Sequence, residues 1–166
     1  IEKFKIVSNK ELKLDASGYY NTILSSKNPF EPNINSKMNI SAYFNKFDLS
    51  SIAELFPKWW SLEGITTGSF VVNGRLNSSD INFSLNVINP KFSLLNGNQL
   101  NIRGRYNNKR LYFENIIAYT LNGEYTSEGY IPIDLDVISE NKNRFINNEP
   151  IALKFFGKSR SMELIT

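Results

Sequence analysis

Cysteine and histidine are both absent from this 166-residue chain. Without cysteine it forms no disulfide and offers no thiolate as a nucleophile or a metal ligand. Without histidine it has no Ser-His-Asp or Cys-His catalytic group, and it lacks the side chain that most often acts as a general base. We therefore expect a protein that is not an enzyme, with no catalytic residue, no cofactor and no metal site.

Long apolar runs and an excess of one charge are lacking as well. No stretch approaches the roughly 18 apolar residues of a membrane-spanning helix, so we expect any membrane anchor to lie outside this segment. The 19 basic and 16 acidic side chains leave a net charge of only +3. Because a nucleic-acid-binding surface needs a concentrated basic field, we expect no nucleic-acid partner.

Alternation of apolar and polar residues dominates what is present. It is clearest over 37–44, 80–87, 100–107 and 110–114, and it predicts strands with one dry face and one wet face. Turn-forming residues separate these strands at the spacing of an antiparallel meander. The predicted turns are 77–79, 89–90, 96–98, 107–108 and 121–123. The glycines of a further strand over 62–76 share the parity of its apolar residues, which indicates bending or close approach of another strand.

One short helix is expected over 48–56, with Asp48 as its N-cap and Pro57 just beyond its end. Trp59 and Trp60 follow it. We interpret this pair as packing the helix end against the sheet, with anchoring at a lipid interface as the alternative.

Three segments divide the chain. Residues 1–34 are expected to be the end of a preceding β unit followed by an irregular connection over 18–34. Residues 35–138 form the main β repeat, and 139–166 comprise a polar linker, to about 149, and the start of a following β unit. Alternation is already present at residues 1–7, and it starts again at 151–155. We therefore expect the sheet to continue beyond both ends of this segment.

The apolar side chains on the inward parity must be covered. Burial of each large one is worth roughly 1.5–3 kcal/mol, so the sheet must close on itself, pack on a second sheet or hold something apolar that is not protein. The pattern leaves a self-filled sandwich and an open groove as alternatives. The side chains expected to line a groove, here the predicted groove set, are Met38, Ile40, Phe44, Phe70, Val72, Leu76, Ile81, Phe83, Leu85, Val87, Leu100, Ile102, Tyr106, Leu111 and Phe113.

Two further sets of charged residues are candidates for binding, catalytic or metal sites. The basic set is Arg103, Arg105, Lys109 and Arg110, and the acidic pairs are Glu124 with Glu128 and Asp134 with Asp136. We interpret the basic set as a solvated outer face, with anionic headgroups or a nucleic-acid backbone as alternatives. Carboxylates two or four residues apart on strands are too common to indicate glycosidase chemistry or a Ca²⁺ site.

The order of helix, proline and glycine-punctuated strand over 47–57 and 62–74 resembles a TamB-type repeat. The hairpins through 100–106 and 123–132 continue the likeness, which covers about 35–135. TamB is the inner-membrane-anchored subunit of the translocation and assembly module, is related to AsmA-like proteins, and occurs in bacteria with two membranes.

The resemblance implies an elongated, curled antiparallel sheet, a β-taco with an apolar groove. It implies a segment of a periplasmic lipid-transfer bridge that moves phospholipids between the inner and outer membranes and supports outer-membrane biogenesis. The parent protein would be anchored in the inner membrane, with phospholipid acyl chains and an outer-membrane β-barrel of the Omp85 type as partners. The alternative is an extracellular or outer-membrane-associated β-structural module that acts through protein–protein contacts.

Overall fold

The computed structural model describes one antiparallel sheet, and its described residues are 3–8, 11–20, 36–50, 62–92, 95–136 and 144–159. The sheet has ten strands. They are β1 (Lys3–Ser8), β2 (Glu11–Tyr20), β3 (Lys37–Asp48), β4 (Leu62–Arg75), β5 (Ser78–Phe92), β6 (Leu95–Asn96), β7 (Gln99–Asn107), β8 (Arg110–Tyr119), β9 (Gly123–Pro132) and β10 (Ala152–Ser159).

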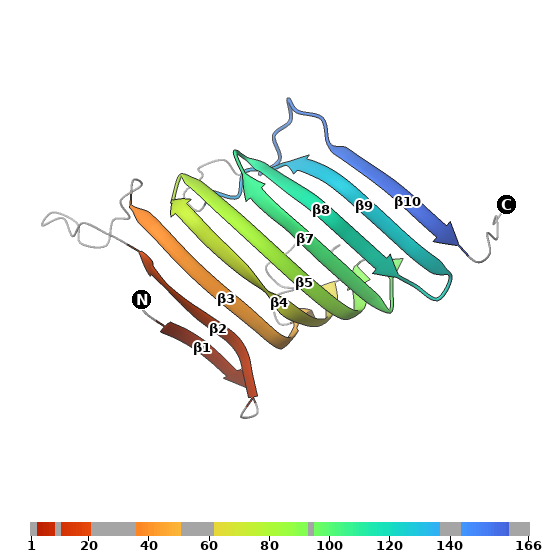
Figure 1. The fold of residues 1–166 in the computed structure, drawn as a ribbon, viewed down its shortest axis with the longest axis horizontal. Helices are drawn as coiled ribbons and strands as arrows, with labels where there is room; N and C mark the ends of the chain where they lie inside the picture. The colour runs from red at the N-terminus through yellow and green to blue at the C-terminus, as the bar shows by residue number, and fades with distance from the viewer. Residues whose placement is uncertain are drawn as a thin grey trace, which may run out of the picture.

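The strands follow one another across the sheet in chain order, with β1 and β10 at its two edges (Figure 1). The short strand β6 lies off this path and pairs only with the end of β5. The predicted fold class, an elongated and curled antiparallel all-β sheet, is confirmed. Within the described ranges, no helix is long and apolar enough to cross a membrane.

Directly paired residues point to the same side of a sheet, so the register assigns each side chain to one of two faces. The apolar face carries Leu14, Ala16, Tyr20, Met38, Ile40, Ala42, Phe44, Phe47, Thr66, Phe70, Val72, Ile81, Phe83, Leu85, Val87, Leu100, Ile102, Tyr106, Leu111, Phe113, Ile116, Ala118, Tyr125, Ser127, Ile131, Leu153 and Phe155. The polar face carries mainly Asn, Ser, Arg, Lys, Glu and Tyr between them.

Irregularities in the register bend the sheet. Shifts occur between Phe44 and Phe47, Glu63 and Ile65, Arg103 and Gly104, and Phe113 and Ile116. An extra residue on one strand increases the local twist and turns the ladder. The strongest bend is visible where β4 and β5 curve at one end of the sheet (Figure 1), and there Gly64 and Asn89 take positive φ values of 131° and 50°.

Four of the five predicted turns are found, and one is wrong. Asn108 and Lys109 form the β7–β8 turn, both with positive φ (49° and 57°), which suits the right-handed twist of a two-residue hairpin. Asn89 and Pro90 were predicted as a turn but lie within β5. The chain bends there without reversing, because the pairing with β4 continues beyond a register shift to Lys91 and Phe92, and the Asn89 N–H donates to the Asn98 carbonyl.

Other predictions lie partly beyond the described residues. The Asp48 carboxylate accepts a hydrogen bond from the Ser50 N–H at 2.9 Å, as an N-cap does, but 51–56 and the Trp59-Trp60 pair are outside the described part. Strand β2 extends to Tyr20, so the irregular connection predicted from residue 18 starts later. Strands from all three predicted segments belong to one continuous sheet, since β2 pairs with β3 and β10 pairs with β9.

Candidate functional site

The register brings the predicted groove set together. Every member except Leu76 lies on the apolar face, in rows that cross several strands. One such row joins Gly68, Leu85, Ile102 and Ile116 on β4, β5, β7 and β8. Leu76 was predicted as the last residue of a strand but lies in the β4–β5 turn, where its side chain is nevertheless buried.

Several apolar-face residues were missed by the sequence pattern. Ile116 and Ala118 follow the register shift in β8, which moves their parity onto the face of Phe113. A bulge switches the parity of the apolar residues along the strand, and without the pairing of β8 the switch after Phe113 reads as the end of the alternation. Leu153 and Phe155 alternate cleanly, but only the pairing of β10 with β9 places them on the same face.

Aromatic contacts link neighbouring strands on this face. The Phe44 ring lies 5.7 Å from the Phe70 ring and 5.5 Å from the Phe47 ring, centroid to centroid. Phe83 meets Phe113 edge-on at 6.5 Å, across β7, where Gly104 has no side chain to separate them. Such pairs add to the stability gained from area burial and hold the face in shape.

The apolar face is only partly buried. Met38, Ala42, Val87 and Tyr106 are buried. Most of the larger apolar side chains between them are partly exposed, including Phe70 on β4, Leu85 on β5 and Ile102 on β7. From β2 to β10 the face spans seven inter-strand spacings, about 34 Å at ~4.8 Å each. It is therefore a broad apolar surface whose larger side chains keep part of their area exposed.

One end of the apolar face is crossed by polar residues. The Tyr106 hydroxyl, buried on β7, accepts a hydrogen bond from the Leu135 N–H at 3.0 Å and donates to the Asp136 carboxylate at 3.4 Å. Asp134 in turn accepts from Lys109 Nζ at 3.1 Å and from the Asp136 N–H. Residues 134–136 thus cover the Tyr106 end of the face.

Burial sets the ionisation of this cluster. It raises the pKa of Tyr106 to about 12, with the charges of Asp136 and Asp134 acting in the same direction. Burial also raises the pKa of Asp136, with the Asp134 charge adding to the effect and Lys109 opposing it. The acidic pair at 134 and 136 thus contacts Tyr106 and Lys109, and within the described ranges no group of three or more acidic side chains is placed to hold a metal ion.

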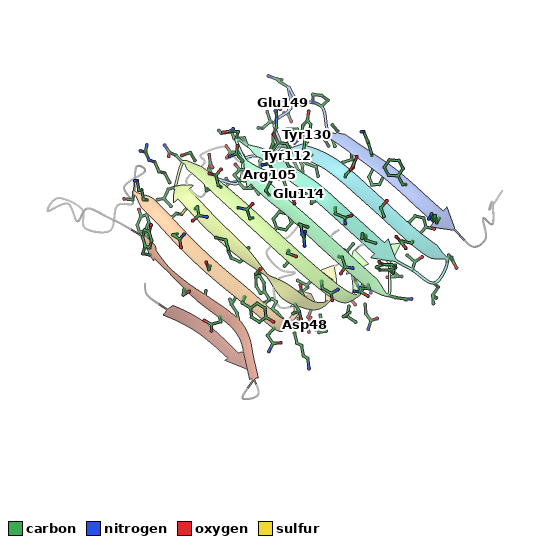
Figure 2. All side chains as sticks on the ribbon, viewed as in Figure 1. Asp48, Arg105, Tyr112, Glu114, Tyr130 and Glu149 are labelled. Carbon is green, nitrogen blue, oxygen red and sulfur yellow. The ribbon has the colours of Figure 1, made fainter. Side chains whose placement is uncertain are left out.

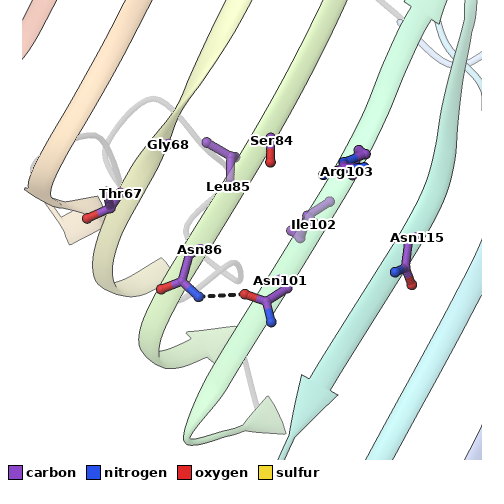
Figure 3. Close-up of a pocket in the computed structure, with 9 residues that line it drawn as sticks. All are labelled: Thr67, Gly68, Ser84, Leu85, Asn86, Asn101, Ile102, Arg103 and Asn115. Carbon is purple, nitrogen blue, oxygen red and sulfur yellow. Dashed lines mark hydrogen bonds between the residues drawn. The ribbon is translucent and has the colours of Figure 1, made fainter.

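The polar face carries several hollows, of which two lie over β4–β10. One, of about 370 Å³, is lined by Thr67, Gly68, Ser84, Leu85, Asn86, Asn101, Ile102, Arg103 and Asn115 (Figure 3). A second, of about 570 Å³, is lined by Arg105, Tyr112, Phe113, Glu114, Glu128, Gly129, Tyr130, Ala152, Leu153 and Lys154. Figure 3 shows the hydrogen bond from the Asn86 amide to the Asn101 side-chain oxygen that crosses the first hollow.

The predicted basic set is placed at one hairpin. Arg103 and Arg105 are exposed on the polar face, where the Arg105 guanidinium lies over the Tyr112 ring at 5.2 Å. Lys109 is paired with Asp134 at 3.1 Å, and Arg110 with Glu149 at 2.8 Å. These two pairs reduce the positive charge that the sequence pattern suggested.

Comparison with known proteins adds no relative. No protein-family model, no curated protein and no solved structure matches this chain, so the TamB-type resemblance stays a prediction.

Proposed function

We propose that the apolar face binds the acyl chains of phospholipids, and that this chain is a segment of a periplasmic lipid-transfer bridge between two membranes. The observation that carries the proposal is the continuous apolar face from β2 to β10, whose central side chains are partly exposed. An exposed apolar surface of this extent is costly in water and marks a site for an apolar partner.

The dimensions suit a hydrocarbon chain. An extended acyl chain of roughly 20 Å crosses about four strands, fewer than the apolar face provides. The described part of the face offers hydrocarbon and aromatic side chains, and we propose that acyl chains slide along it passively. The periplasmic location, the inner-membrane anchor of the parent protein and the Omp85-type partner belong to the proposal and rest on the sequence resemblance alone.

The test compares two neighbouring residues on β5 that point to opposite faces. Leu85→Asp places a carboxylate in the centre of the apolar face, and Ser84→Asp places the same group on the exposed polar face. Both proteins are purified, extracted with organic solvent and analysed for phospholipid by mass spectrometry.

We expect phospholipid to co-purify with the wild type and with Ser84→Asp, but not with Leu85→Asp, while circular dichroism shows the same sheet in all three. Wild-type protein without bound phospholipid would refute the proposal. Unfolding of Leu85→Asp would instead indicate that this face is the filled core of a closed structure, because an unpaired charge is not tolerated there.

A second candidate function has its own observation. The edge strand β10 exposes Phe155 and Phe156 at 75% and 59% of their surfaces, one on each face. An edge strand with exposed aromatic side chains invites pairing with a strand of another protein. If the chain is a β-structural module, Phe156→Lys would abolish capture of a protein partner and leave bound lipid unchanged.

A further inference from the structure

The polar face carries an aromatic pair that the apolar face does not explain. Tyr112 on β8 and Tyr130 on β9 are direct cross-strand partners, with ring centroids 5.7 Å apart (Figure 2). Arg105 lies over the first ring at 5.2 Å and Arg110 over the second at 5.3 Å. Each guanidinium group lies over one face of its ring, and the rest of the pair borders a hollow.

Space lies beside the pair. The next residue in the cross-strand row is Ala152 on β10, which is too small to cover the neighbouring Tyr130 ring. The resulting hollow of about 570 Å³ has charged groups of both signs on its rim, with Arg105 and Lys154 against Glu114 and Glu128. An aromatic wall with donors and acceptors around it is the composition of a small-ligand site.

The hollow shown in Figure 3 continues the same surface. Arg103 and Arg105 are successive polar-face residues of β7, about 7 Å apart along the strand, and each lines one of the two hollows. Apart from Arg103, the side chains that bring polar groups to the Figure 3 hollow are amides and hydroxyls. An extended ligand therefore meets an aromatic site and an amide site on one face.

We propose that this part of the polar face, from Asn101 to Tyr130, binds an uncharged oligosaccharide. The apolar C–H face of a sugar ring packs on Tyr112 and Tyr130, and its hydroxyl groups exchange hydrogen bonds with charged and amide side chains. A single-stranded nucleic acid also stacks on aromatic rings, but Glu114 and Glu128 offset the positive charge of this surface, and Glu128 lies 3.8 Å from Lys154 Nζ, so phosphates would not meet a concentrated positive field. The proposal concerns the face opposite the lipid site and does not depend on lipid binding.

The experiment titrates the purified chain with maltotetraose, cellotetraose and tetra-N-acetylchitotetraose, and separately with an octamer of uridylate, using calorimetry and amide NMR shifts. Tyr130→Ala removes one ring, and Tyr43→Ala removes an exposed tyrosine elsewhere on the same face as the matched control. Tyr130→Phe keeps the ring and removes only the hydroxyl. Tyr130→Leu, which keeps an apolar side chain but has no ring, replaces Tyr130→Ala if that variant does not fold.

We expect saturable binding of at least one of the three oligosaccharides, with shifts confined to the amides around the two hollows, on β4, β5 and β7–β10. Tyr130→Ala should weaken binding by roughly tenfold, the scale of one lost ring contact, while Tyr130→Phe and Tyr43→Ala bind as the wild type. No binding of any of the three, equal losses from Tyr130→Ala and Tyr43→Ala, or binding of the uridylate octamer alone would each overturn the proposal.

Discussion

Gly104 is the position where the geometry of the sheet makes the sharpest prediction about stability. A Cβ built on this residue lies 2.3 Å from the Tyr112 carbonyl oxygen and 2.6 Å from Phe83 Cζ, whereas ordinary contact begins at 3.4 Å. The carbonyl belongs to the neighbouring strand, so β7 and β8 must separate before an alanine fits. Overpacking of this kind costs about 1–3 kcal/mol, offset by about 0.4–1 kcal/mol from the stiffer unfolded chain.

We therefore expect Gly104→Ala to lower the free energy of unfolding by about 1–2 kcal/mol, with an unchanged urea m-value. The matched control is Gly157→Ala on β10, where the added Cβ meets only the Tyr125 ring, a side chain that can move. The control should change stability by less than about 0.5 kcal/mol. Urea denaturation followed by circular dichroism measures both. A Gly104→Ala variant as stable as the wild type would refute the close approach of Phe83 and β8 to this glycine.

Three further predictions concern buried polar groups on the apolar face. Tyr106→Phe should lower the free energy of unfolding, measured by urea denaturation, by about 1–3 kcal/mol. The reason is that the Leu135 N–H and the Asp136 carboxylate lose the hydroxyl as their hydrogen-bond partner. An unchanged free energy of unfolding would contradict these hydrogen bonds. The raised pKa of Asp136 means that the folded chain holds this proton more tightly than the unfolded chain, so stability falls as pH rises from the ordinary value of 3.8 through the folded pKa. Asp136→Asn should therefore be more stable than the wild type at pH 7 and lose that advantage below about pH 3.8 in thermal melts across pH; a constant difference would contradict the shift. Ser127→Ala should be neutral or stabilising by up to about 1 kcal/mol, since the buried hydroxyl has no hydrogen-bond partner in the described part of the chain, and a clear loss in thermal melts would point to a missed partner.

Alternation alone was enough to predict the sheet and most of its apolar face. The run from Asp80 to Val87 has a period of two, and its pairing with β4 and β7 leaves only one face for its apolar side chains. The β7–β8 and β8–β9 turns were also visible, because asparagine and glycine adopt the backbone angles that tight turns need.

Bulges and tertiary closure were not predictable. The register shifts near Asn89 and Ile116 depend on how neighbouring strands pair. The sequence therefore predicts a turn at Asn89, and it does not assign Ile116 to the apolar face. The cover over Tyr106 arises from residues about thirty positions later in the chain, and no local pattern indicates it. The Tyr112–Tyr130 pair was missed for the same reason, since only the β8–β9 register brings the two rings together.

The most direct test of the account uses the absence of native cysteine, which makes single-cysteine labelling unambiguous. Ile102→Cys on the apolar face and Arg103→Cys on the polar face are each labelled with bimane and mixed with phosphatidylethanolamine and phosphatidylglycerol vesicles. The vesicles carry a phospholipid with a nitroxide on its acyl chain. The account predicts strong quenching at position 102 and little at 103. Equal quenching at both positions, or none at 102, would contradict the claim that the apolar face holds acyl chains.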